Sequence, residues 1–94
     1  MVDLDAMQAD IVAWAEGRFS PTIEQHWCLM GLVGEVGELA QEMLKQEEGV
    51  KSVNEQAIRN EIGDIAIFLL HLCTRRGCQL SEILRQRWEE VKCR

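Results

Sequence analysis

Apolar residues recur along the chain at intervals of three and four, the spacing that places side chains on one face of an α-helix. The pattern predicts four helices and no strand. A glycine lies at the end of each of the first three segments, where glycine commonly ends a helix. The expected helices run from about Leu4 to Glu16, from Pro21 to Glu47, from Val53 to Arg76 and from Ser81 to the C-terminus, with Ser52 and Ser81 as the expected N-caps of the last two.

Each predicted helix carries one apolar stripe that we expect to face a common core. The connections are short, so neighbouring helices should pack antiparallel. The sequence therefore predicts an all-α fold, a four-helix antiparallel bundle formed by residues 1–94 as a single domain. The stripes are Leu4, Met7, Ile11, Trp14 and Ala15; Leu29, Leu32, Val36, Leu39 and Met43; Ile58, Ile62, Ile65, Leu69 and Leu72; and Ile83, Leu84, Trp88 and Val91.

Three glycines, Gly31, Gly34 and Gly37, recur at every third position inside the second predicted helix. Each costs about 1 kcal/mol relative to alanine in a helix interior. We interpret them as positions where another helix approaches closely. They do not form a glycine-rich phosphate loop, because no strand precedes them.

The composition restricts the possible partners. The chain has 10 basic and 16 acidic residues and a net charge of −6, which argues against a nucleic-acid duplex as a partner. No apolar run reaches the roughly 18 residues that a membrane span needs. A chain of 94 residues buries little surface alone, so we expect a homodimer or homotetramer.

The cysteines are Cys28, Cys73, Cys78 and Cys93. They form no C-x-x-C pair, and no signal peptide is recognisable before them. We expect four reduced thiols in a cytoplasmic protein, two or three of them acting as small core residues.

Two acid-x-x-acid pairs, Glu35-Val-Gly-Glu38 and Glu61-Ile-Gly-Asp64, lie in the second and third predicted helices. A spacing of three places both acids of a pair on one helix face, where like charges repel. Both pairs lie about 100° of rotation from the centre of their apolar stripe, so antiparallel packing would bring all four to one cleft. All-oxygen ligation suits Mg²⁺, or Mn²⁺ as a substitute, and the repulsion would be offset by such a cation.

The spacing alone leaves the alternative that these acids are solvated surface residues. Glu42 continues the acidic face one turn beyond Glu38, as a further ligand or as a solvated neighbour. Zinc is disfavoured because it prefers nitrogen and sulfur ligands, and a di-iron site would need Glu-x-x-His pairs.

The motifs GLVGEVGELAQE and NEIGDIAIFLLHL, with their acids and flanking residues, resemble the MazG family of all-α nucleoside triphosphate pyrophosphohydrolases. The resemblance extends from about Trp14 to Trp88. It implies that Glu35, Glu38, Glu61 and Asp64 bind Mg²⁺, which holds a triphosphate. It also implies hydrolysis between the α and β phosphates to give a nucleoside monophosphate and pyrophosphate.

The resemblance also suggests roles for other residues. Glu38, or else Glu35, is the candidate catalytic base that takes a proton from the attacking water. The candidate phosphate-binding residues are Lys45 and Arg87, although Val91 stands where family members often have asparagine. Residues before the metal motif are candidates for nucleobase binding, namely Trp14, His26 and Trp27. Trp14 at this helical spacing is more often a core residue, and His26 could equally be a surface residue. Trp88 is expected in the core, and His71 is expected to be packed and hydrogen-bonded.

Two other functions stay open at this stage. One is phosphoribosyl-ATP pyrophosphohydrolysis, which would use the same metal-binding acids with a different pocket. The other is a non-catalytic helical module that binds nucleotides or mediates oligomerisation, although a degenerate binder would not be expected to keep all four acids.

Overall fold

The computed structural model contains four α-helices, and its described residues 2–18, 25–49 and 54–94 form no strand. The predicted all-α class is therefore confirmed. The predicted helix starts at Pro21 and Val53 lie outside the described residues. The helices are α1 (Leu4–Arg18), α2 (Gln25–Glu48), α3 (Glu55–Arg75) and α4 (Leu80–Lys92).

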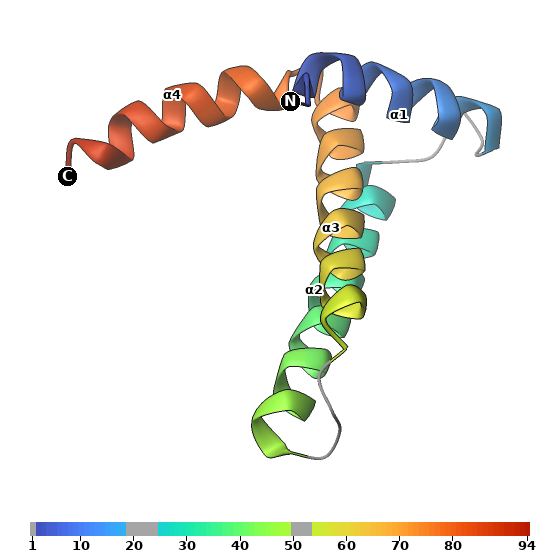
Figure 1. Cartoon of the computed structure of the whole chain (residues 1–94). Helices are drawn as coiled ribbons and strands as arrows, with labels where there is room; N and C mark the ends of the chain where they lie inside the picture. The colour runs from blue at the N-terminus through green and yellow to red at the C-terminus, as the bar shows by residue number, and fades with distance from the viewer. Residues whose placement is uncertain (1, 19–24, 50–53) are drawn as a thin grey trace.

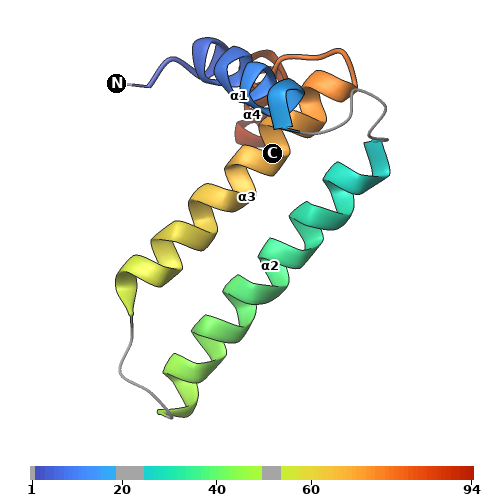
Figure 2. The same cartoon turned by 90° about the vertical axis from the view of Figure 1, so that its right-hand side faces the viewer.

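The two longest helices, α2 and α3, lie side by side with the chain reversing direction between them (Figure 2). We call this pair the α2–α3 hairpin. Helix α1 lies across the C-terminal end of α3, and α4 leaves that same end and points away from the hairpin (Figure 1). Helix α4 contacts α1 but makes no extensive contact with α2 or α3.

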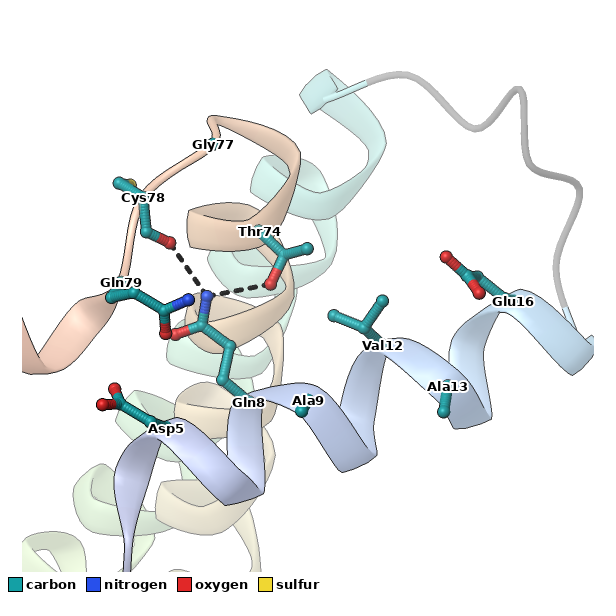
Figure 3. A pocket seen from close by; sticks show the side chains of 10 residues that line it. All are labelled: Asp5, Gln8, Ala9, Val12, Ala13, Glu16, Thr74, Gly77, Cys78 and Gln79. Carbon is teal, nitrogen blue, oxygen red and sulfur yellow. Dashed lines mark hydrogen bonds between the residues drawn. The ribbon is translucent and has the colours of Figure 1, made fainter.

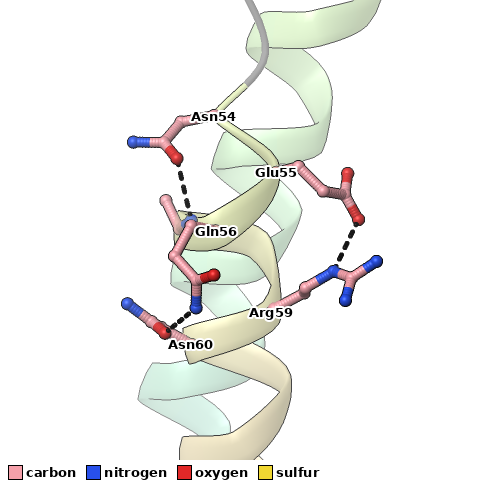
Figure 4. Close-up of polar contacts among 6 residues, drawn as sticks. Asn54, Glu55, Gln56, Arg59 and Asn60 are labelled. Atoms are coloured by element: carbon pink, nitrogen blue, oxygen red, sulfur yellow. Dashed lines mark hydrogen bonds and ion pairs between the residues drawn. The ribbon is translucent and has the colours of Figure 1, made fainter.

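Helix α3 begins with a side-chain cap. The Asn54 carboxamide oxygen accepts a hydrogen bond of 3.1 Å from the Ala57 N–H, which satisfies one of the unpaired amides of the first turn. The cap predicted at Ser52 lies outside the described residues. Two side-chain pairs spaced by one turn follow on the exposed surface, Glu55 with Arg59 and Gln56 with Asn60 (Figure 4).

Helices α1, α3 and α4 meet around one buried side chain, Gln8, which is only 3% exposed. Its Nε2 donates to the Thr74 hydroxyl and to the Cys78 carbonyl, both at 2.9 Å (Figure 3). Its Oε1 accepts from the Leu80 N–H at 3.2 Å. Since a buried amide is costly unless its donors and acceptors are paired, Gln8 fixes the turn between α3 and α4 against α1.

A second contact holds the start of α4. The hydroxyl of Ser81, predicted as the N-cap, donates instead to the Asp5 carboxylate of α1. The helix begins one residue earlier, and its N-cap, Gln79, makes no capping hydrogen bond with its side chain. The prediction of Ser81 as the cap was wrong because α1 offers that hydroxyl a carboxylate acceptor.

The core is small and lies mainly between α1 and the C-terminal half of α3. The radius of gyration is 15.6 Å, against about 12 Å for a compact chain of this length. The expectation that every apolar stripe faces a common core is wrong for α4, which has no described helix over its stripe. It is also wrong for Leu29, Val36 and Met43 of α2 and Ile62 of α3, which are 47–53% exposed. Trp88, expected in the core, is 57% exposed. The buried apolar residues are Ile11, Ala15, Cys28, Leu70 and Cys73.

Gly31 is the one interior glycine of α2 with a close neighbour. A Cβ at this position would clash with the Phe68 ring of α3, so the glycine lets the two helices approach. Gly34 and Gly37 have nothing within 4 Å of an added Cβ. The predicted close approach is therefore confirmed at Gly31 alone, and the neighbour is a side chain rather than a helix backbone.

All four cysteines are free thiols, with Cys28 and Cys73 buried as small apolar residues, as predicted. Burial raises the pKa of both thiols. Among the described helices, none is both long enough and apolar enough to cross a bilayer.

Candidate functional site

Three of the four predicted acids meet across the hairpin. Glu35 and Glu38 come from α2, and Glu61 comes from the facing side of α3. One carboxylate oxygen from each lies within 4.8 Å of the other two. We call these three residues the acid cluster. Glu35 and Glu61 are half-buried in the seam between the helices, whereas Glu38 is exposed at its edge.

The fourth predicted acid, Asp64, does not belong to this cluster of three, but it lies beside it. Asp64 and Glu35 line the same pocket at the edge of the seam. The sequence prediction that both acid pairs flank one cleft is thus consistent with the placement of Glu35, Glu38 and Glu61 and with the position of Asp64 beside them.

The acid cluster contains buried oxygens without hydrogen-bond donors. Glu35 Oε2 and Glu61 Oε2 are both inaccessible to solvent and both lack a partner among the described residues. A buried carboxylate oxygen without a donor is costly, because it has lost its water and gained nothing in exchange. A proton or a cation placed between the two helices would relieve this cost.

The proton is one of the two ways to satisfy these oxygens. The pKa of Glu61 is raised to about 7, first because its protonated carboxyl can donate a hydrogen bond to Glu35, then because of burial and the negative charges of Glu38 and Glu35. Two ionised carboxylates cannot hydrogen-bond to each other, so the bond exists only while one carries a proton. A divalent cation would replace this proton and be held by oxygen atoms.

A pocket of about 280 Å³ adjoins the acid cluster. It is formed by α1, α2 and α3, and its wall is mainly apolar and aromatic. Trp14, for which the sequence left core and ligand-binding roles open, is 50% exposed and lines this pocket. Carboxylates therefore meet an aromatic wall in one place. The lining residues are Ile11, Trp14, Glu35, Asp64, Ile67, Phe68 and His71.

His71 lies in the wall of this pocket, which the sequence did not predict. The expectation of a hydrogen-bonded histidine is not met, since no described residue makes a hydrogen bond to its imidazole. Burial, and to a smaller degree the positive charge of Arg75, lowers the pKa of His71. Burial therefore favours the neutral form of the imidazole. Its spacing of seven residues from Asp64, two helical turns, was the available signal for its position.

The two predicted phosphate-binding residues lie outside the acid cluster. Lys45, in the last turn of α2, pairs with Glu42 at 3.4 Å, which gives Glu42 a cation partner outside the cluster. Arg87, on α4, pairs with Glu90 of the same helix at 2.6 Å. The isolated chain does not bring either cation to the carboxylates.

His26 and Trp27 lie at the start of α2. Their rings stack on each other, with centroids 6.0 Å apart, and Trp27 is 61% exposed. Neither residue is among those that line the pocket beside the acid cluster. Of the three predicted nucleobase contacts, only Trp14 adjoins the carboxylates.

The chain matches no protein-family profile, no curated protein and no solved structure. The resemblance to the MazG family stays a prediction from the motifs, and the functional argument depends on the acid cluster and its pocket.

Proposed function

We propose that this protein is a Mg²⁺-dependent nucleoside triphosphate pyrophosphohydrolase that converts ribo- or deoxyribonucleoside triphosphates to monophosphates and pyrophosphate. The observation that carries the proposal is the acid cluster, with its two unpaired buried oxygens, beside an aromatic pocket. The MazG-like motifs supply the reaction type.

The donor set fits a hard divalent cation. Glu35, Glu38 and Glu61 offer oxygen atoms close enough to share one ion, and Asp64 adds a carboxylate at the pocket edge. Mg²⁺ and Mn²⁺ prefer such ligands. When bound, the metal would hold the anionic phosphates and stabilise the charge that develops on their oxygens.

Glu38 suits the role of catalytic base better than Glu35, because it is the exposed member of the cluster and is open to water. In the proposed step the water oxygen bonds to the α-phosphorus and its proton passes to the Glu38 carboxylate. The bond from the α-phosphorus to the bridging oxygen breaks, and pyrophosphate leaves with that oxygen. A proton acceptor of this kind contributes about 10²- to 10⁴-fold to a rate.

The pocket provides a place for the nucleobase. The Trp14 ring can stack on a base while the triphosphate extends toward Glu35 and Asp64. Lys45 and Arg87 are the proposed partners of the outer phosphates, and each would first exchange its present carboxylate partner for a phosphate. His26 and Trp27 would contact a base only if it extended beyond this pocket.

The assembly forms part of the proposal. The extended shape and the small core favour a homodimer or homotetramer in which the helices complete an antiparallel bundle. The four free thiols fit a reducing, cytoplasmic location.

The experiment is a panel of ribo- and deoxyribonucleoside triphosphates together with phosphoribosyl-ATP, scored for pyrophosphate with Mg²⁺ and with chelator. Mg²⁺-dependent release of pyrophosphate from nucleoside triphosphates supports the proposal. Turnover of phosphoribosyl-ATP alone would instead identify the protein as a phosphoribosyl-ATP pyrophosphohydrolase. Nucleotide binding without any turnover would contradict enzymatic activity and favour a binding module.

A further inference from the structure

Helix α4 presents an apolar face that nothing in the described chain covers. Leu84 is 56% exposed and Trp88 is 57% exposed, and Ile83 and Val91 are exposed beside them. The charged residues of α4 lie mainly around the remaining surface. A helix with this pattern is normally half-buried against a partner.

The direction of α4 is set by the fold. Gln8, itself buried, hydrogen-bonds to the Cys78 carbonyl and the Leu80 N–H at the start of α4, and Asp5 accepts from Ser81 one residue later. Folding α4 back over its own hairpin would break these contacts and leave the buried Gln8 amide with Thr74 as its one remaining described partner. The chain therefore holds the apolar face of α4 away from its own hairpin.

The α2–α3 hairpin has an exposed apolar face of its own. Leu29, Val33, Val36 and Met43 recur along one side of α2 at intervals of four, three and seven, and each is 47–62% exposed. Ile62 of α3 is 53% exposed. We call these five residues the hairpin apolar face.

Helical geometry places the hairpin apolar face on the opposite side of the seam from the carboxylate edge. Val36 and Ile62 each follow a seam glutamate by one residue, a rotation of about 100°. Glu38 and Asp64 each follow a seam glutamate by three residues, about 60° the other way. Because α2 and α3 run in opposite directions, equal rotations lead to the same side of the hairpin. A partner on the hairpin apolar face would leave the carboxylates open.

The two unpartnered faces also differ in charge. At 100° per residue, Glu47 falls on the hairpin apolar face of α2, whereas Arg87 and Arg94 fall beside the apolar face of α4 with one acid, Glu90. Opposite net charges favour contact between α4 and α2 over contact between two α4 helices.

We propose that the apolar face of α4 docks on the hairpin apolar face of a second copy of this chain. The α4 of the second copy docks in the same way on the hairpin apolar face of the first. Such a two-fold exchange covers both apolar faces on both copies at once. The proposal depends on the assembly part of the proposed function and not on its chemistry.

The first experiment measures the mass in solution by sedimentation equilibrium. The double variant Leu84→Ser/Trp88→Ser is expected to weaken association at least tenfold. Gln86→Ser, on the opposite face of α4, is the matched control and keeps the wild-type mass. Val33→Asp alters the other face and is expected to weaken association as well, so the proposal stays falsifiable if the α4 variant fails to fold.

A second experiment locates the contact with the exposed thiol of Cys93, at the end of α4. A maleimide photocrosslinker attached there, in a mixture of ¹⁵N-labelled and unlabelled chains, is expected to give heavy–light crosslinks to α2 or α3. Crosslinks between two α4 helices would overturn the proposed exchange.

The outcomes separate the claims. A wild-type monomer that hydrolyses triphosphates would refute the assembly and this interface while leaving the chemistry intact. An oligomer that survives all three substitutions would refute the interface alone. A monomer that binds phosphatidylserine vesicles through Trp88 would instead identify α4 as a membrane-surface helix and overturn the docking proposal.

Discussion

The junction around Gln8 and the acid cluster in the hairpin differ in whether their buried polar atoms have hydrogen-bond partners. The Gln8 amide pairs with three groups, while Glu35 Oε2 and Glu61 Oε2 have no donor among the residues that the structure describes. Both regions lie in the same small chain and both are partly or fully buried. The fold can thus satisfy a buried side chain where only structure is required, which suggests that the unsatisfied carboxylates are kept for a ligand.

The largest expected effect follows from removing the exposed acid of the cluster. Glu38→Gln keeps the size of the side chain but cannot accept a proton or bind a cation as a carboxylate does. We expect a loss of at least about a hundredfold in pyrophosphate release, with unchanged helicity by circular dichroism. Glu47→Gln, an exposed acid of the same helix, is the control and is expected to retain activity. Full turnover by the Glu38 variant would remove the acid cluster from the mechanism.

The Gln8 junction predicts the reverse result, a loss of stability without a loss of metal binding. Gln8→Leu leaves the Cys78 carbonyl and the Leu80 N–H without their partner, which we expect to lower the free energy of unfolding by about 2–3 kcal/mol. Urea titration measures the loss, and calorimetry checks that Mg²⁺ affinity is retained. Gln56→Leu removes an exposed glutamine bond to Asn60 and is expected to cost less than about 0.5 kcal/mol. Equal costs for the two variants would contradict the role of Gln8.

The shared proton predicts how pH affects metal binding. The folded protein holds a proton on Glu61 up to about pH 7, whereas an unfolded chain releases it near the ordinary value of 4.5. The cation must displace that proton, so Mg²⁺ affinity should fall about tenfold per pH unit below pH 7 and level off above it. Calorimetry in two buffers of different ionisation enthalpy would detect the released proton. Affinity that does not change between pH 6 and 8 would argue against a cation between Glu35 and Glu61.

Stability without metal provides the control for this titration. Because the pKa of Glu61 is raised in the folded state, protonation stabilises the fold; this stabilisation is complete below pH 4.5 and lost as the pH rises through about 7. Without metal, the Glu61→Gln variant should therefore have a higher melting temperature than the wild type at pH 8. At pH 4 the two melting temperatures should be equal. A lower melting temperature at pH 8 would contradict the repulsion inferred for the cluster.

The sequence predicted the helices and much of the acid cluster, and the reason is that both depend on local spacing. Glu35 and Glu38 share a helix face wherever that helix packs, and the glycine at 31 marks the close approach of Phe68. The direction of α4 could not be predicted, because it depends on Gln8, a polar residue within the predicted first helix that pairs with groups 66 or more residues away. Periodicity showed that Trp88 needs a partner surface but not which molecule supplies it.

The smallest expected effect is a difference in stability between alanine substitutions at Gly31, which the hairpin needs, and at Gly34. Gly31→Ala places a methyl group against the Phe68 ring between α2 and α3, and we expect a cost of about 1–3 kcal/mol as the ring or the helices shift. Gly34→Ala meets nothing within 4 Å and is expected to stabilise the helix by about 0.5–1 kcal/mol. Thermal unfolding under the same conditions measures whether each substitution lowers or raises the melting temperature. If both substitutions raised the melting temperature, α2 and α3 would not be in close contact at Phe68, and the seam that brings Glu35 to Glu61 would be arranged differently.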